Sequence, residues 1–255
     1  MAQTDAAKGG RYLYAVVPGP GARTYSFTGL DDKPVYTIAH KEVAAVVSDV
    51  PNGQVRPERR YLAVQQAVLK GLMQESLAVL PMSFGIIADG PKAIQKILAS
   101  NQEAILKQLQ RVAGKVEMGL RVAWDVPNIF EYFVNTHQEL RLARDRLVGP
   151  SRHPTQEDKI ELGRLFDRLL QEDRETYTDQ VVEILSRHCF EIKQNRCRHE
   201  HEVMNLACLV GCQAQTQARF EEGVFAAARL FDNHYAFDYN GPWAPHNFVD
   251  LDLEL

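Results

Sequence analysis

Cysteine and histidine side chains gather in the last third of the chain, where together they could bind a metal ion. The run Cys197-Arg198-His199-Glu200-His201 follows Cys189 and precedes two further cysteines, Cys208 and Cys212. Zinc is held in a tetrahedron by four thiolate or imidazole ligands, and this region contains enough of both. Residues 189–212 are therefore the candidate region for a metal-binding or catalytic function.

The spacing of these residues argues against a metal site. The region has no Cys-x₂-Cys pair, and its His-Glu-His run lacks the His-Glu-x-x-His spacing of zinc hydrolases. Cys208 lies in the apolar run Leu206-Ala207-Cys208-Leu209-Val210, which predicts a small buried residue. His199 and His201 stand among charged residues, so we expect them to face solvent. We expect no metal and no cofactor.

Other catalytic signatures are missing from the sequence. It has no Gly-x-Ser-x-Gly elbow for a serine nucleophile and no Gly-x-x-x-x-Gly-Lys-Ser/Thr loop for phosphate. The acidic pairs Asp31-Asp32 and Asp250/Asp252 are typical of a surface loop and a tail. We therefore expect no catalytic residues and no enzyme activity.

The composition is that of a globular protein. Of 255 residues, 45% are hydrophobic and 24% are charged, and the net charge of −4 does not favour nucleic acid or an anionic membrane as partner. The longest apolar stretch, 77–88, is interrupted by Pro81, Ser83 and Gly85, and it is shorter than the roughly 20 residues that span a bilayer. Residues 1–11 lack the apolar core of a secretory signal. These features predict a soluble cytoplasmic protein, in which disulfides are not the default.

Alternating and helical patterns predict a β-rich first domain, residues 1–125. We expect strands at 12–17, 35–39, 43–47 and 77–87, and helices that start near Pro57 and Pro91. In residues 116–124, Val116, Met118, Leu120, Val122 and Trp124 alternate with other residues, which predicts a strand with one buried face.

The pattern becomes mostly helical after Asp125-Val126-Pro127-Asn128, which predicts a second domain over residues 126–255. Helices are expected at 129–147, 155–187 and 213–233, with a break at 149–154, and strands at 189–194, 203–210 and 235–239. The predicted fold class is α+β, with two domains that are each a modified ferredoxin-like sheet with helices packed on it.

The C-terminal segment 239–249 reads Tyr-Asn-Gly-Pro-Trp-Ala-Pro-His-Asn-Phe-Val. Gly241-Pro242 predicts a turn, and two prolines restrict the segment around Trp243. Trp243 suits either a domain core or a partner interface, since tryptophan is enriched at binding hot spots. We expect the segment to close the second domain. The candidate partner-binding residues are Trp243, Pro242, Pro245 and Phe248.

Four dispersed segments in this order resemble the gas vesicle protein F/L family (GvpF/GvpL). They are Ala-Ala-Val-Val-Ser-Asp-Val-Pro at 44–51, Val-Leu-Pro-Met-Ser-Phe-Gly at 79–85, Gly-Lys-Val-Glu-Met-Gly-Leu-Arg-Val-Ala-Trp-Asp at 114–125, and the C-terminal segment. The resemblance extends from about Tyr12 to Val249. The chain departs from the family pattern at Ser83, Ala244 and His246, while Asn205-Leu206-Ala207 keeps the family's Asn-x-Ala.

The resemblance implies an accessory or minor structural protein of gas vesicles, which are gas-filled protein shells in the cytoplasm. It implies a role in shell assembly, contacts with the main shell protein and other gas vesicle accessory proteins, and neither catalysis nor a cofactor. The alternative hypothesis is a metal- or small-molecule-binding ferredoxin-like enzyme that uses the cysteine and histidine region 189–212.

Overall fold

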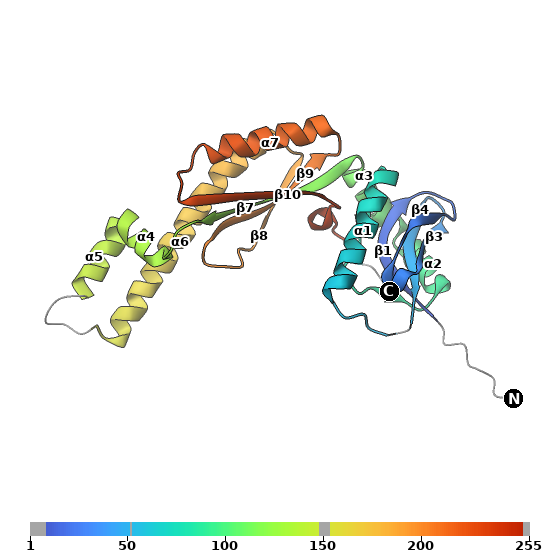
Figure 1. Cartoon of the computed structure of the whole chain (residues 1–255), viewed down its shortest axis with the longest axis horizontal. Helices are drawn as coiled ribbons and strands as arrows, with labels where there is room; N and C mark the ends of the chain where they lie inside the picture. Colours follow the sequence, from blue (N-terminus) through green and yellow to red (C-terminus); the bar gives the residue numbers. More distant parts are fainter. Residues whose placement is uncertain (1–8, 52, 148–153, 252–255) are drawn as a thin grey trace. The chain divides into compact units, whose positions relative to one another are not determined.

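The computed structural model describes residues 9–51, 53–147 and 154–251, which form two compact units (Figure 1). The first unit combines the chain up to Glu117 with the chain from Pro242 onward, and the second covers Met118–Gly241. The sequence pattern places the division at 125/126 and the C-terminal segment in the second domain. The expected tail 1–11, the break at 149–154 and the acidic end of the chain fall largely outside the described residues.

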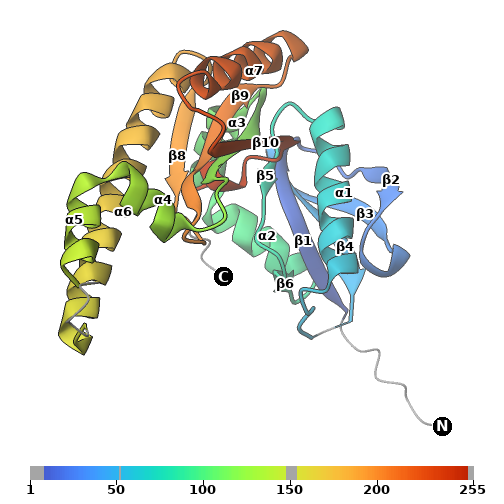
Figure 2. The ribbon, with the colours of Figure 1, turned by 60° about the vertical axis from the view of Figure 1, so that its left-hand side comes forward.

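The first unit is built on an antiparallel sheet in the order β2-β3-β4-β1-β5, with β6 also paired to β1. Figure 2 shows this sheet with the helices of the same unit beside it. Its strands are β1 (Gly10–Pro18), β2 (Thr24–Thr28), β3 (Pro34–His40), β4 (Val43–Val50), β5 (Leu80–Pro81) and β6 (Ile87–Ala88), and its helices are η1 (Leu30–Asp32), α1 (Arg59–Glu75), α2 (Pro91–Ser100), α3 (Gln102–Val112) and η2 (His246–Phe248). Strand β2 was not predicted.

The prediction of one strand over residues 77–87 was wrong, because β5 and β6 pair separately with β1. Between them the backbone turns, and Gly85 adopts a φ of 90° that favours glycine. Buried hydrogen bonds hold this turn: the Gly85 N–H donates to the Tyr12 hydroxyl (3.1 Å), which donates to Gln65 Oε1 (2.6 Å). Gln65 Nε2 donates in turn to the Met82 carbonyl (3.0 Å). The turn is thereby tied to both β1 and α1.

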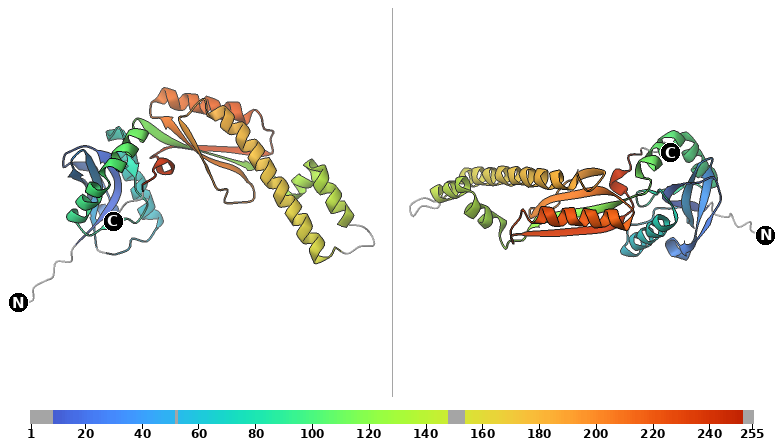
Figure 3. Two further views of the ribbon diagram at one scale, coloured as in Figure 1. Left: turned by 180° about the vertical axis from the view of Figure 1, so that it is seen from behind. Right: turned by 90° about the horizontal axis from the view of Figure 1, so that it is seen from above.

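The second unit has a four-stranded sheet in the order β10-β7-β9-β8. Its elements are β7 (Lys115–Trp124), α4 (Ile129–Thr136), α5 (Gln138–Leu147), α6 (Gln156–Leu185), β8 (Glu191–Asn195), β9 (Glu202–Gly211), α7 (Ala214–Ala228) and β10 (Tyr235–Trp243). Helices α6 and α7 lie on one face of this sheet, and α4 and α5 lie beside the N-terminal half of α6 (Figure 3). If α4 to α6 count as one helical connection, the chain order is β-α-β-β-α-β. The predicted α+β class is confirmed.

Two expected helices are each divided by one residue. The helix predicted at 129–147 breaks at His137 into α4 and α5, and the helix predicted from Pro91 breaks at Asn101 into α2 and α3. Helix α6 begins where expected, since Thr155 and Asp158 form a reciprocal capping box.

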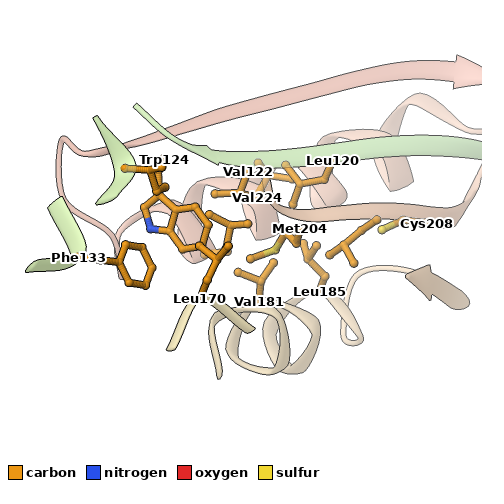
Figure 4. Packing of buried hydrophobic residues seen from close by; sticks show 14 of the residues in the cluster. Leu120, Val122, Trp124, Phe133, Leu170, Val181, Leu185, Met204, Cys208 and Val224 are labelled. Atoms are coloured by element: carbon orange, nitrogen blue, oxygen red, sulfur yellow. The ribbon is translucent and has the colours of Figure 1, made fainter. Parts of the chain in front are cut away.

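The core of the second unit lies between β7, β9 and the two long helices (Figure 4). The expected burial of the alternate residues of β7 is confirmed, and Arg121 on the opposite side is exposed. The strand was expected in the first domain, but all of it from Met118 onward belongs to the second unit. The buried side chains of this core include Leu120, Val122, Trp124, Leu170, Val181, Leu185, Met204, Cys208 and Val224.

Replacing Leu120 by Ala should lower the free energy of unfolding of the second unit by about 2–5 kcal/mol, because Leu120 is fully buried and its loss leaves a cavity. Urea unfolding followed by Trp124 fluorescence, in a Trp243→Phe background, measures this value. Arg121→Ala, next to it on the exposed side, is the control and should change stability by less than about 0.5 kcal/mol. An unchanged unfolding midpoint for Leu120→Ala would contradict the core assignment.

Candidate partner-binding segment

The C-terminal segment continues β10 and does not begin with a turn. Strand β10 runs through Gly241 and Pro242 to Trp243, so the expected turn at Gly241-Pro242 was wrong. A proline has no N–H to donate to a neighbouring strand, and β10 is an edge strand of its sheet, where this is tolerated. From Pro242 onward the chain belongs to the first unit, and after Trp243 it continues through Ala244 into the short helix η2.

A buried carboxylate anchors this segment. Glu117, which is only 7% exposed, accepts hydrogen bonds from the Asn247 backbone N–H (2.8 Å to Oε2) and from Asn247 Nδ2 (2.6 Å to Oε1). Burying a carboxylate is costly unless donors compensate for the lost water. The alternating pattern of residues 116–124 places Glu117 on the side of the strand opposite the predicted buried face. Asn247 was not predicted as its partner.

A second anchor lies at the end of the described chain. Asp250 forms an ion pair with Arg111 of α3 (2.9 Å), and its backbone carbonyl accepts a long hydrogen bond from Gln108 (3.4 Å). Both Arg111 and Asp250 are partly exposed, so we assign this contact a smaller contribution than the buried one. The segment is therefore held on both sides of Phe248.

The four candidate partner-binding residues divide into two pairs. Pro245 and Phe248 are buried, and Ala244 beside them belongs to the core of the first unit. Pro242 and Trp243 are exposed, and Trp243 keeps 43% of its surface accessible. Of these four residues, Pro242 and Trp243 are therefore the two that are accessible to a partner.

The four cysteines occupy different environments. Cys208 is fully buried in the core of the second unit, as expected, and its thiol hydrogen-bonds to Cys189, which lowers the pKa of Cys189. Cys197 donates to the Val203 carbonyl (3.6 Å), and Cys212 is exposed. Within residues 9–51, 53–147 and 154–251, no three His, Cys, Asp or Glu residues are placed to hold one metal ion.

The loop between β8 and β9 is held by an arginine that the sequence pattern did not single out. Arg174 of α6 donates to the backbone carbonyls of His199 (3.1 Å) and Glu200 (2.9 Å) in the loop and to that of Glu202 (2.8 Å), the first residue of β9. Its guanidinium lies 5.9 Å from the ring centre of Trp124. Arg174 thus has a structural role in holding this loop.

The same loop borders a polar groove between α6 and the strands β8 and β9. The groove encloses about 530 Å³, and Arg174, Glu175, Asp179, Arg196 and Cys197 contribute to its lining. Burial raises the pKa of the Cys197 thiol, which disfavours the thiolate that a nucleophile or metal ligand requires. The groove therefore brings together charges of both signs around a thiol whose pKa is raised.

Replacing Asn247 by Ala should destabilise the first unit by about 1.5–3 kcal/mol, because the buried Glu117 carboxylate loses a charge-assisted donor. Limited proteolysis should then cut the C-terminal segment faster than in the wild-type protein, and the free energy of unfolding should fall. The neighbouring exposed position, His246→Ala, serves as control and should leave both measurements unchanged. Equal protease resistance in the two variants would refute the anchoring role.

Comparisons with known proteins identify relatives over almost the whole chain. The family model for gas vesicle synthesis protein GvpL/GvpF matches residues 10–250. Gas vesicle protein F of Dolichospermum flosaquae is 26% identical over 94% of this chain and 98% of that protein. Gas vesicle protein L1 of Halobacterium salinarum is 31% identical over 54% of this chain and 51% of that protein.

Solved structures agree with the fold. The crystal structure of GvpF from Anabaena sp. PCC7120 superposes with a TM-score of 0.81 at 22% identity, over 96% of this chain and 99% of that one. GvpF from Microcystis aeruginosa gives a TM-score of 0.80 at 20% identity, over 95% and 99% of the two chains. The match of the family model over 10–250, on a chain with these two units, shows that the protein belongs to the GvpL/GvpF family of gas vesicle proteins.

Proposed function

We propose that this protein acts in gas vesicle assembly by binding the main gas vesicle shell protein, together with other gas vesicle accessory proteins, without catalysing a reaction. Membership of the GvpL/GvpF family supports the connection to gas vesicles. The separate environments of the cysteines and histidines in the described parts of the chain favour binding over the alternative, an enzyme built on region 189–212.

The observation that carries the proposed binding role is the exposed Trp243 on an anchored support. Tryptophan combines a large apolar surface with few rotatable bonds, and it is enriched at binding hot spots. The hydrogen bonds between Glu117 and Asn247 and the ion pair of Asp250 fix the chain that follows Trp243. A support that is already ordered loses less conformational entropy when a partner binds, so more of the contact energy appears as affinity.

The proposed place of action is the gas vesicle within the cytoplasm, with no role for membrane or nucleic acid. Across the described residues, no helix combines the length and apolar character required to cross a bilayer. The net charge of −4 gives no general attraction to phosphate backbones. A partner with an apolar surface suits Trp243 better than a polyanion does.

Replacing Trp243 by Ala should weaken binding to the purified main shell protein at least about tenfold while the protein stays folded. Quantitative pull-down and thermal unfolding on the same preparation measure the two effects. Leu77→Ala is the matched control, since Leu77 is an exposed apolar residue of the same unit, and this variant should bind normally. Loss of folding in Trp243→Ala would instead assign Trp243 a core role, and normal binding with normal folding would remove it from the interface.

Deleting the gene should abolish or deform gas vesicles and reduce cell buoyancy, because an assembly protein is needed before a shell can grow. Electron microscopy of cells and a flotation assay measure this outcome. A wild-type copy should restore vesicles, and a copy carrying Trp243→Ala should restore them less well than one carrying Leu77→Ala. Normal buoyant cells after deletion of every copy of the gene would refute the assembly role.

A further inference from the structure

Helix α7 presents an apolar patch to solvent in addition to the face that it buries. Phe220, Val224 and Ala227 face the core of the second unit. On the opposite side Phe225 keeps 56% of its surface exposed, although a phenylalanine at a helical position normally packs inward. This outer side bears a shallow hollow lined by Glu222, Phe225, Ala226, Ala228 and Arg229.

The charges around this hollow have an order that a second copy of the same helix would complement. Glu222 lies three residues before Phe225, and Arg229 lies three residues after Ala226. Positions 222 and 229 are seven residues apart, which places them on the same side of the helix, two turns from each other. Both side chains are exposed, and neither takes part in an ion pair found among the described residues.

We propose that α7 is a homodimer interface, in which two copies of the chain pair α7 antiparallel about a twofold axis between Phe225 and Ala226. A twofold axis brings each residue opposite the one equally far from the axis on the other copy. Phe225 then faces Ala226 of the second copy, a large side chain against a small one. Glu222 faces Arg229 of the second copy, and this ion pair forms twice.

Charge complementarity selects the second copy and this orientation. A parallel pairing in register would place Glu222 against Glu222 and Arg229 against Arg229, where like charges repel. The antiparallel pairing replaces both repulsions by attractions. It also places Phe225 of each copy against the hollow of the other copy. A single pair of helices is a small interface, so the dimer should be weak, dependent on protein concentration, and weaker at high salt.

The test uses charge reversal and sedimentation velocity over a series of protein concentrations at low salt. The wild-type protein should shift from monomer to dimer as concentration rises. Glu222→Arg and Arg229→Glu should each weaken self-association at least about tenfold, because each places like charges opposite one another twice. An equimolar mixture of the two variants should form a heterodimer, because positions 222 and 229 then carry opposite charges in both of the pairings across the twofold axis.

Rescue on mixing distinguishes this geometry from a loss of folding, since an unfolded variant would not recover its partner. Lys96→Glu on α2, an exposed position of the other unit, carries the same change of charge as Arg229→Glu and should dimerise like the wild-type protein. A wild-type protein that stays monomeric up to the highest concentration overturns the proposal. So does a dimer that both single reversals leave intact, or a mixture of the two variants that fails to associate.

Discussion

The contact between Glu117 and Asn247 joins residues 130 positions apart in the chain and ties the returning C-terminal segment to β7. Glu117 is the last residue of the first unit before the chain enters the second, and Asn247 lies on the returning segment. A buried carboxylate without donors would destabilise the strand that carries it, so the returning segment completes the environment that Glu117 requires. The first unit therefore cannot reach its full set of contacts until nearly the entire chain is available.

The two units use different means to fix their irregular segments. In the first unit, hydroxyl and amide groups of Tyr12 and Gln65 satisfy the backbone of the turn between β5 and β6. In the second unit, Arg174 donates to three carbonyls in the loop after β8 and at the start of β9, and it lies over Trp124. Each set of hydrogen bonds joins polar groups from distant parts of the chain, because irregular backbone lacks the partners that a helix or sheet supplies.

The fold separates the cysteines and histidines of region 189–212 into different environments. One thiol is buried in an apolar core, another donates to a backbone carbonyl, and His201 lies with its Nδ1 atom 3.2 Å from the Trp124 carbonyl. Two exposed aromatic side chains, Trp243 and Phe225 of α7, belong to the two proposed binding surfaces. Both side chains belong to regular elements, β10 and α7, and aromatic residues are enriched at binding hot spots.

Local pattern by itself determined much of this protein. The alternation in residues 116–124 predicted the buried face of β7, the helical pattern over 155–187 predicted α6, and four dispersed segments indicated the family. These signals are local because side-chain period and capping act within a few residues.

The tertiary structure decided which unit each segment joins, and it placed β7 in the second sheet and the C-terminal segment in the first unit. It also divided residues 77–87 into two strands, buried Glu117 and gave Arg174 its partners. Each of these outcomes depends on contacts between residues far apart in the chain, and such contacts leave no periodic trace in the sequence around either partner.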